Sequence, residues 1–456
     1  MRIPSPFLNK SIMIRIPDIQ TALLPLVGWR QSYNPKMCID ESLTQTESGL
    51  YYQDAHPLVT LENVSAVMPD GYMFQYQKWN IIIPYRAGDK CQHGGYVWIA
   101  KVDNVGQEPP AEDFNDDYSQ DFGSTYWRAY NILTDYVRQQ TESAIAQTVQ
   151  TFLQVKGLLK ETKSLLERRT FFDGAGRLVN TQMPQGKLVG FEISPVRAMG
   201  VTTRIERIGL QMTGATGTVR MYLFHSSQVD PIRTADLEFT RENGGFQWFD
   251  MTDWYLPYIG RENNSGGSWY LVYNQNDLPE GMLAINATKD WSTEPCMTCN
   301  PGSVAAWREL TKYLLISPFK VHALETFEQY PEMWDIDDNM YTNTCNYGLN
   351  VEVSVECDLT EFIIQQRQMF ATVLARQLAA NVIRTMAMNP DVRTNRNQSN
   401  VSAQGMLYEL DGNPEGRAGG LGYELKKAYD ALDLNTRGID RICLTCRPIG
   451  ARYRTV

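Results

Sequence analysis

The sequence predicts a multidomain α+β protein. A β-rich N-terminal region, a long α-helix, an antiparallel β-sandwich (jelly-roll-like) and a helical C-terminal region are expected to follow one another. Three observations lead to this prediction: short β-branched and aromatic runs between turn residues, an apolar repeat of helical period and a capping box before the last helices. The 456 residues are enough for two to four domains, each with its own core. We place the boundaries at 1–123, 124–170, 186–288 and 289–456.

The first region indicates short strands joined by turns. Aromatic and β-branched residues gather at 72–76, 79–85 and 95–102, with Pro, Gly and Asp between them. An acidic loop at 108–117 ends the region. It lacks the ligand spacing and the glycine of a calcium loop, so we interpret it as a solvated linker.

A helical pattern runs from Ser124 to about Arg169. Its apolar residues recur in alternating steps of four and three, with a lysine at each missed turn. They are Ile145, Val149, Phe152, Leu159 and Leu166. One interpretation is an arm of a helical hairpin, or two helices broken near Gly157. The other is an arm that packs against neighbouring subunits through a coiled-coil-like seam.

The third region predicts an antiparallel sandwich, because seven short strand-like runs alternate with Gly- and Asn-rich turns. The runs are Lys187–Ser194, Arg204–Met212, Thr218–His225, Asp236–Thr240, Phe246–Phe249, Trp269–Tyr273 and Met282–Asn286. Exposed aromatic side chains on such a sandwich can bind glycans, although core and interface packing is their commoner role. The candidates are Trp248, Trp254, Tyr255, Tyr258, Trp269 and Tyr270.

The last region begins with the most regular strand pattern in the chain. Between Leu349 and Cys357, apolar and polar residues alternate without exception up to Glu356. Asp358 and Glu361 then form a capping box, which predicts a helix to about Met388. Two more helices are expected near 402–410 and 423–432.

Two cysteine pairs, Cys296-Met-Thr-Cys299 and Cys443-Leu-Thr-Cys446, are the candidates for a metal site. The spacing of each pair lets both thiolates bind one ion, and two pairs supply the four sulfurs of a tetrahedral structural zinc. One shared ion would tie the end of the chain to its middle and leave no open position for catalysis. Disulfides and unpaired buried thiols are the alternatives. In every case the cysteines have a structural role.

Other chemistry-bearing patterns are sparse, so we expect no enzyme. Nucleophile–base pairs usually need a histidine, and none of the four histidines sits in a catalytic motif. They are His56, His93, His225 and His322. Cys91-Gln-His93 offers only two metal ligands, and 335–339 is only a fragment of a calcium loop. Gly419-Gly-Leu-Gly422 precedes a helix, but no Gly-Lys-Ser/Thr follows it.

Charge and composition exclude several classes of partner. The net charge of -10 gives no basic field for sequence-specific nucleic-acid binding or for acidic membranes. No apolar stretch approaches the length that spans a bilayer, and the first 20 residues do not resemble a signal peptide. Eight cysteines are too few for a disulfide scaffold, which favours synthesis in a reducing compartment. The 24 Tyr and 10 Trp suit protein–protein interfaces.

Four blocks of sequence, spread over most of the chain, carry a family resemblance. The first is Asp40-Glu-Ser-Leu with Ser48-Gly-Leu-Tyr-Tyr52 and Asp54-Ala-His-Pro57, and the second is Gly190-Phe-Glu-Ile-Ser-Pro195. Asn346-Tyr-Gly-Leu-Asn350 with Cys357-Asp-Leu-Thr360 forms the third, and Cys443-Leu-Thr-Cys446 the fourth. These blocks resemble virion structural proteins of tailed phages that infect Bacteroidetes. Ring-forming head–tail connectors of crAss-like phages are a neighbouring option in this class.

The resemblance implies a structural component of a phage particle, in the neck, connector ring or tail. Such a protein would be made in the cytoplasm of the host bacterium and located in the virion. We expect it to form a homo-oligomer and to contact other virion structural proteins. The alternative is a glycan- or receptor-binding tail protein that acts through the sandwich.

The cysteine pairs give a first prediction. If Cys296, Cys299, Cys443 and Cys446 share one zinc ion, a chelator should loosen the C-terminal region, because the unfolded chain has no preformed site. Cys443→Ser should likewise release the end of the chain from its middle, as followed by limited proteolysis. Indifference to the chelator would instead favour disulfides.

Overall fold

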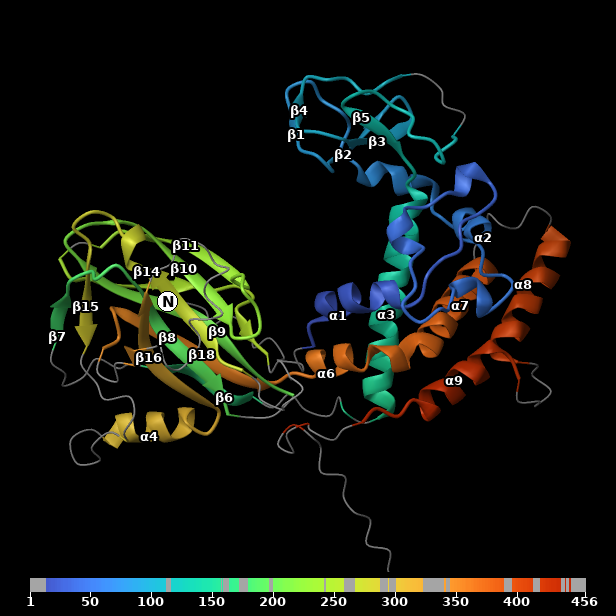
Figure 1. The fold of residues 1–456 in the computed structure, drawn as a ribbon. Helices are drawn as coiled ribbons and strands as arrows, with labels where there is room; N and C mark the ends of the chain where they lie inside the picture. The colour runs from blue at the N-terminus through green and yellow to red at the C-terminus, as the bar shows by residue number, and fades with distance from the viewer. Residues whose placement is uncertain are drawn as a thin grey trace, which may run out of the picture. The chain divides into compact units, whose positions relative to one another are not determined.

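All seven strands expected between residues 187 and 288 form, each within a few residues of the expected bounds (Figure 1). They are β8 (Lys187–Pro195), β9 (Val201–Thr213), β10 (Gly217–His225), β11 (Arg233–Phe239), β12 (Phe246–Asp250), β14 (Trp269–Asn274) and β15 (Leu283–Ala287). The short β13 (Tyr255–Leu256) and a 3-10 helix, η6 (Gln275–Asp277), were not expected.

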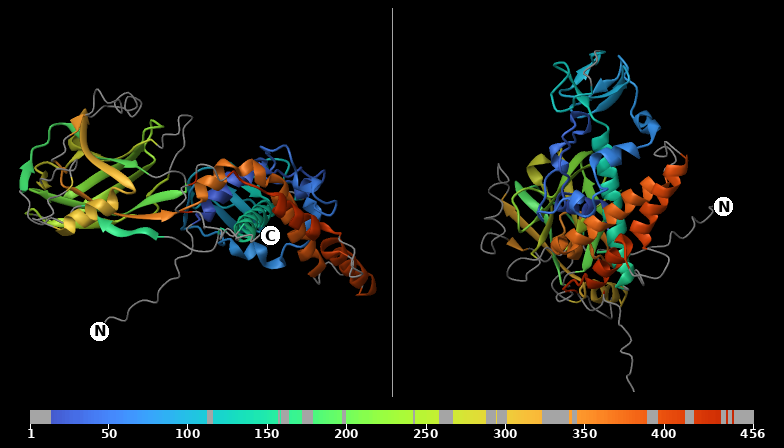
Figure 2. Two further views of the ribbon diagram at one scale, coloured as in Figure 1. Left: turned by 90° about the horizontal axis from the view of Figure 1, so that it is seen from below. Right: turned by 90° about the vertical axis from the view of Figure 1, so that its right-hand side faces the viewer.

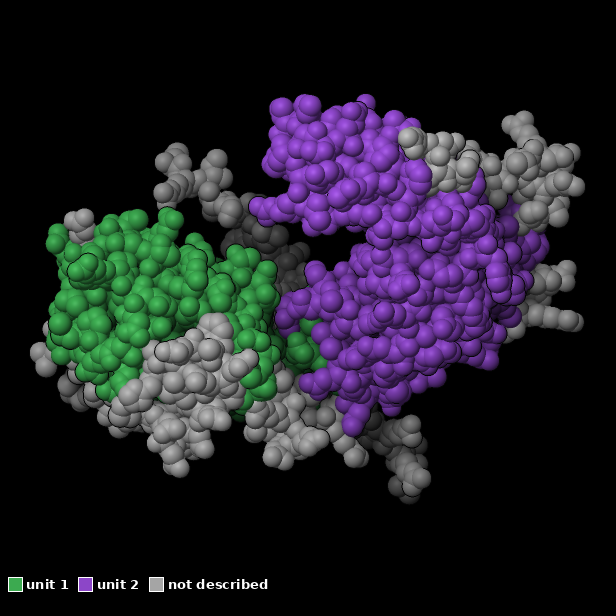
Figure 3. Space-filling view, turned by 45° about the horizontal axis from the view of Figure 1, so that its top comes forward, with its two compact units in different colours: residues 1–14, 159–362, 436–456 green, residues 15–158, 363–435 purple. Residues whose placement is uncertain are grey.

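The computed structural model describes residues 14–111, 116–156, 158, 164–171, 179–196, 200–241, 243–257, 267–287, 294, 301–322, 340–341, 345–388, 396–412, 419–435, 439 and 443. These residues belong to two compact units, which Figure 3 distinguishes by colour. Unit 1 comprises 1–14, 159–362 and 436–456, and unit 2 comprises 15–158 and 363–435. From residue 15 on, the chain therefore passes from unit 2 into unit 1, back into unit 2, and again into unit 1.

Unit 1 is built from two antiparallel sheets that face each other (Figure 2). The strand order is β11-β10-β14-β8-β16-β17 in the six-stranded sheet and β6-β18-β9-β15-β7 in the seven-stranded sheet, where β12 and β13 also pair with β9. Five strands come from outside the range 187–288: β6 (Ser164–Thr170), β7 (Val179–Gln182), β16 (Leu314–His322), β17 (Met340–Tyr341) and β18 (Leu349–Cys357). A helix, α4 (Pro301–Leu310), precedes β16.

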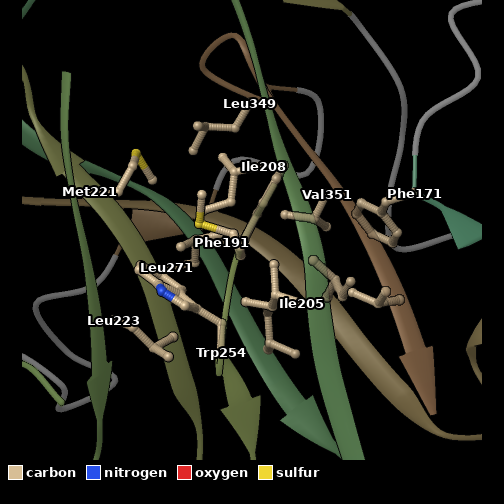
Figure 4. Packing of buried hydrophobic residues seen from close by; sticks show 14 of the residues in the cluster. Phe171, Phe191, Ile205, Ile208, Met221, Leu223, Trp254, Leu271, Leu349 and Val351 are labelled. Atoms are coloured by element: carbon tan, nitrogen blue, oxygen red, sulfur yellow. The ribbon is translucent and has the colours of Figure 1, made fainter. Parts of the chain in front are cut away.

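The core of unit 1 fills the space between the two sheets (Figure 4). Phe191 and Leu271 from one sheet meet Ile205, Ile208 and Val351 from the other, and all five are fully buried. Burial of side chains of this size contributes about 1.5–3 kcal/mol each relative to exposure. The inward positions of β18 follow from its alternating sequence, so its expected apolar face is confirmed.

Unit 2 combines a helical bundle with a small β-region. The helices are α1 (Ile16–Leu23), α2 (Leu61–Ala66), α3 (Leu133–Val155), α7 (Ala371–Met388), α8 (Arg396–Asp411) and α9 (Leu421–Ala431). The α3 helix contacts α1, α7 and α9, and α7 contacts α8 and α9 (Figure 2). The buried residues of α3 include Val137, Ile145, Val149 and Phe152, which recur at helical spacing.

The long helix is shorter than the sequence pattern predicts. It begins at Leu133 rather than Ser124, because Trp127 belongs to β5 (Trp127–Tyr130) and is fully buried in the core of the small β-region. It ends at Val155, and β6 takes up the last part of the expected helix. Leu166 enters the core of unit 1 because β6 pairs with β18, so tertiary pairing overrides the local helical repeat there.

The small β-region contains β2 (Lys90–His93), β3 (Tyr96–Ala100) and β5 in one sheet, and β1 (Pro84–Tyr85) with β4 (Asn104–Val105) in another. The strand expected at 95–102 is therefore confirmed. The strand expected at 72–76 is wrong, since these residues lie largely in a 3-10 helix, η5 (Asp70–Gln75), and only the end of 79–85 is extended.

Further 3-10 helices connect the elements of unit 2: η1 (Leu24–Leu26), η2 (Pro35–Met37), η3 (Glu41–Leu43), η4 (Tyr52–Asp54) and η8 (Arg367–Phe370). The helix expected from Asp358 to Met388 is interrupted by η8 and so consists of α6 (Thr360–Gln365) and α7. Asp358 lies two residues before α6, one residue earlier than the cap position of these bounds, and its Oδ1 accepts the first backbone N–H of the helix, that of Thr360, at 2.8 Å.

Close packing of β8 against β14 gives a second prediction. A Cβ on Gly190 would lie 2.0 Å from the carbonyl oxygen of Leu271. Gly190→Ala should therefore push the strands apart and lower the free energy of unfolding by about 2–4 kcal/mol in chemical denaturation. A matched control is Gly405→Ala, where a Cβ would meet no described atom outside the nearby backbone of α8 within 4 Å, and α8 should gain about 0.5–1 kcal/mol. Equal effects of the two substitutions would refute the packing argument.

Candidate functional site

One of the four candidate zinc ligands lies among the described residues, and it is bonded to another cysteine. Cys443 forms a disulfide with Cys357, with a sulfur–sulfur distance of 2.07 Å. A disulfide sulfur is not a thiolate, so the predicted four-cysteine zinc site requires this bond to be reduced. Cys296, Cys299 and Cys446 lie outside the described residues. Sequence reasoning missed Cys357 as a partner, because spacing alone does not reveal a pairing over 86 residues.

The described cysteines without a disulfide are Cys38, Cys91 and Cys345. Cys91 is fully buried, and burial raises the pKa of its thiol to about 12. A thiol with such a pKa carries almost no thiolate at neutral pH and is a poor nucleophile or metal ligand. Its neighbour His93 instead pairs with Glu108, with 3.4 Å between Nε2 and Oε1.

Two other motifs have structural explanations. His225 is fully buried at the end of β10, where its Nδ1 lies 2.6 Å from the hydroxyl of Ser227 and accepts the backbone N–H of Ser227 at 3.1 Å.

In the glycine motif at 419–422, a Cβ on Gly420 would lie 2.8 Å from the carbonyl oxygen of Glu409. A Cβ on Gly422 would lie 2.8 Å from the carbonyl oxygen of Leu410. These glycines let the start of α9 approach the end of α8. The calcium-loop fragment at 335–339 lies outside the described residues.

Among the described residues of unit 1, a cluster of charged side chains lies on the seven-stranded sheet, on the face away from the core. We call it the outer-face cluster, and it comprises Arg168, Arg204, Glu206, Arg207, Glu352 and Ser354. The register between β9 and β18 shifts at this point: Glu352 pairs with Arg207 but Val353 pairs with Ile205. Glu206 is the extra residue of this β-bulge, which turns Glu206 and Arg207 to the same face.

The two carboxylates of the outer-face cluster are buried, with exposed fractions of 8% for Glu206 and 6% for Glu352. Glu206 accepts hydrogen bonds from the hydroxyl of Ser354 at 2.7 Å and from Arg168 at 3.1 Å. Arg207 donates to Glu352, and this hydrogen bond raises the pKa of Arg207. Both carboxylates thus accept hydrogen bonds from arginine side chains. The cluster joins β6, β9 and β18.

The arginines of the cluster also cover aromatic rings. The guanidinium carbon of Arg207 lies 4.9 Å from the ring centroid of Trp248, and that of Arg204 lies 5.5 Å from the ring centroid of Tyr255. Of the six glycan candidates, these two rings are half-buried on this face. The other described ones are core residues, with exposed fractions of 4% for Trp254, 1% for Trp269 and 4% for Tyr270. Tyr258 lies outside the described residues.

A partial sequence signal for the outer-face cluster exists. Ile208, Leu210 and Met212 follow the two-residue period of a strand, whereas Ile205 lies three residues before Ile208. Such an offset is typical of a β-bulge and marks Glu206 as the extra residue. Which carboxylate on another strand would join it depends on the pairing of β9 with β18, and no local pattern contains that information.

In unit 2, Asp135 is the centre of a half-buried polar cluster. Its carboxylate accepts hydrogen bonds from Lys90 at 2.7 and 2.8 Å, and from the hydroxyls of Tyr76 and Tyr130 at 2.6 Å each. Burial alone would raise the pKa of Asp135, but the hydrogen bonds from Lys90, Tyr130 and Tyr76 outweigh it and hold this pKa below its usual range. The cluster joins η5, β2, β5 and the first turn of α3.

Two polar cavities open on unit 2. One, of about 580 Å³, lies between α3 and α7, where the amide of Asn381 donates to that of Gln147 at 2.9 Å. The other, of about 590 Å³, is lined by Asp40, Arg128 and Asn131 among others. No histidine is among the described residues that line either cavity. Within the described part of the chain, no group of three His, Cys, Asp or Glu side chains could hold a metal ion.

Comparison with protein families, curated proteins and solved structures finds no match to this chain. None of the helices that the structure describes is long and apolar enough to cross a membrane.

The Asp135 cluster gives a third prediction. Asp135→Asn should lower the free energy of unfolding by about 2–4 kcal/mol at pH 7, because Lys90 is left half-buried without its partner. Because the folded-state pKa of Asp135 is lowered, its carboxylate stabilises the folded state at pH values above the unfolded-state pKa of about 3.9. This contribution is lost as the pH falls through the folded-state pKa. The difference between wild type and variant should therefore shrink as the pH falls below the unfolded-state pKa and through the folded-state pKa of Asp135.

Chemical denaturation at several pH values checks this prediction. Asp18→Asn is the matched control, because Asp18 makes an exposed ion pair with Arg15 at 2.6 Å. Such a surface pair is worth about 0–1 kcal/mol. A deficit of Asp135→Asn that is unchanged at low pH would show that the carboxylate charge is not its cause.

Proposed function

We propose that this chain is a structural subunit of a tailed-phage particle, in the neck, connector ring or tail. It would assemble with copies of itself and with other virion proteins. One observation carries the proposal beyond the sequence resemblance. The described residues of the blocks that carry the resemblance act as anchor points of the fold, which is what a protein whose task is architecture requires.

The first block fixes the N-terminal part of unit 2. Asp40 accepts the backbone N–H of Ser42 at 2.8 Å, and the hydroxyl of Ser48 donates to the carbonyl of Leu26 at 2.6 Å. Tyr52 is fully buried, and its ring centroid lies 5.0 Å from that of Trp29. These contacts hold a segment that has little regular secondary structure.

The other blocks fix unit 1. Gly190 allows the close approach of β8 to β14. The backbone N–H of Asn346 donates to Asn286 at 2.6 Å, and the hydroxyl of Tyr273 donates to the carbonyl of Tyr347 at 2.9 Å. In the fourth block, Cys443 is tied to Cys357. These roles support structural work rather than chemistry on a substrate.

An exposed apolar tip on the small β-region supports self-association. We call it the apolar tip, and it comprises Ile81, Ile82 and Val105, with exposed fractions of 61%, 78% and 58%. Val105 pairs with Pro84 in β1, and Ile81 and Ile82 lie in the turn that precedes β1. Clustered exposed apolar side chains are characteristic of interaction sites, and we expect a second copy of the chain to cover this one.

The fourth prediction concerns assembly. Mass photometry of the full chain should give particles several times heavier than the 52.0 kDa subunit. Changing both Ile81 and Ile82 to Asp should lower the concentration of these particles at least tenfold, since each charge would have to be buried in the interface. Met183→Asp alters a residue with an exposed fraction of 69% in unit 1 and should have little effect. A monomer at micromolar concentration would contradict the proposal.

Glycan or receptor binding is the second candidate function, and it now rests on Trp248 and Tyr255. They are the described candidates that keep part of their rings on the outer face of the sheet. Micromolar binding of a defined oligosaccharide that is abolished by Trp248→Ala would favour this function. Trp269→Ala is unsuitable for this purpose, because it would remove a core residue.

A further inference from the structure

The chain leaves unit 1 and re-enters it, and a disulfide joins residues beside both points. Unit 1 ends its middle segment at Phe362 and resumes at Thr436. Cys357 precedes the first point by five residues (362 − 357), and Cys443 follows the second by seven (443 − 436). The bond therefore closes a covalent ring that contains the entire 363–435 segment of unit 2.

Gly200 lies where the end of β18 meets the segment that re-enters unit 1 at Thr436, which we call the returning segment. The backbone N–H of Asp358 donates to the carbonyl of Gly200 at 3.0 Å, which holds the end of β18 beside it. A Cβ on Gly200 would lie 3.0 Å from Ile439, 3.6 Å from Leu359 and 4.0 Å from the Cβ of Cys443. Ile439 is itself buried, with an exposed fraction of 6%. Cys443 also packs against the core of unit 1, so this apolar contact, the core and the disulfide all hold the returning segment.

The two cysteines of the bond differ in exposure. Cys357 has an exposed fraction of 7%, whereas Cys443 is half-buried. Thiol–disulfide exchange needs approach to one of the two sulfurs, and Cys443 is the less buried residue of the pair. Closure also requires that β18 and the returning segment have both reached Gly200. The bond can therefore form in high yield only once Cys443 has returned to the end of β18 in unit 1.

We propose that the Cys357–Cys443 bond is a redox-sensitive tether that is open in a reducing compartment and closes when a disulfide oxidant such as glutathione disulfide is present. Cys443 first displaces one glutathione thiol to form a mixed disulfide, and the Cys357 thiolate then displaces the second. Two protein thiols thus lose two protons and two electrons, and one glutathione disulfide becomes two glutathione thiols. The idea that the bond closes on release from the host cytoplasm rests on the proposed function. The proposal of a redox-sensitive tether does not rest on it.

The test compares the full-length protein after incubation with glutathione disulfide and with a reductant. Peptide mapping without reduction should recover one cross-link, between the peptides that contain Cys357 and Cys443. The midpoint of thermal unfolding should rise by about 5–10 °C on oxidation, since a cross-link over a long loop constrains the unfolded chain. Cys357→Ser should lose both the cross-link and the rise. Cys38→Ser, which changes a half-buried free thiol, should keep both.

Two results would overturn the proposal: an oxidised wild-type protein without this cross-link, or one whose midpoint is the same in both redox states. The wild-type comparison stands even if Cys357→Ser fails to fold. Assembly does not enter the measurement. A monomer that closes the bond would therefore contradict the proposed function but still support the proposal of a redox-sensitive tether.

Discussion

The pairing of β9 with β18 is the constraint on which most of unit 1 depends. It joins residues 201–213 to residues 349–357, so the sandwich forms only after the chain has returned over more than a hundred residues. The bulge in this pairing places Glu206 and Arg207 on the outer face beside Glu352. At the end of the pairing, Cys357 lies opposite Val201, next to Gly200, and a Cβ on Gly200 would lie 4.0 Å from that of Cys443. The charged cluster and the disulfide thus follow from one strand register.

Both units use half-buried or buried charges to join distant segments. In unit 1 the outer-face cluster connects three strands, and in unit 2 Asp135 connects a long helix to the small β-region. Breaking one partner of a buried pair costs about 3–5 kcal/mol, because an uncompensated charge remains. The charged side chains of these two clusters therefore hold segments of the described fold together. This is consistent with an architectural role, which the proposed function makes specific.

Local sequence patterns were sufficient for most of the elements and for few of their partners. The strands between 187 and 288, the strand 349–357 and the C-terminal helices were predictable because each carries its own periodicity and turn residues. The helix expected at 124–169 was overextended, because Leu166 fits a helical repeat yet pairs into a sheet. The cysteine motifs drew attention to Cys443 but not to Cys357, since pairing partners and the outer-face cluster depend on long-range register. Likewise, the aromatic candidates Trp254 and Trp269 proved to be core residues because a sequence run does not reveal which face is buried.

Hydrogen–deuterium exchange of the full-length protein tests most directly whether the pairing of β9 with β18 holds unit 1 together. If it does, the backbone amides of 201–213 and 349–357 should be among the slowest to exchange and should open together, with the same dependence on denaturant. The opposite result would be fast exchange of 349–357, at rates typical of exposed loops, while β9 and β10 stay protected. That result would contradict the account, because the sandwich would then persist without its return strand.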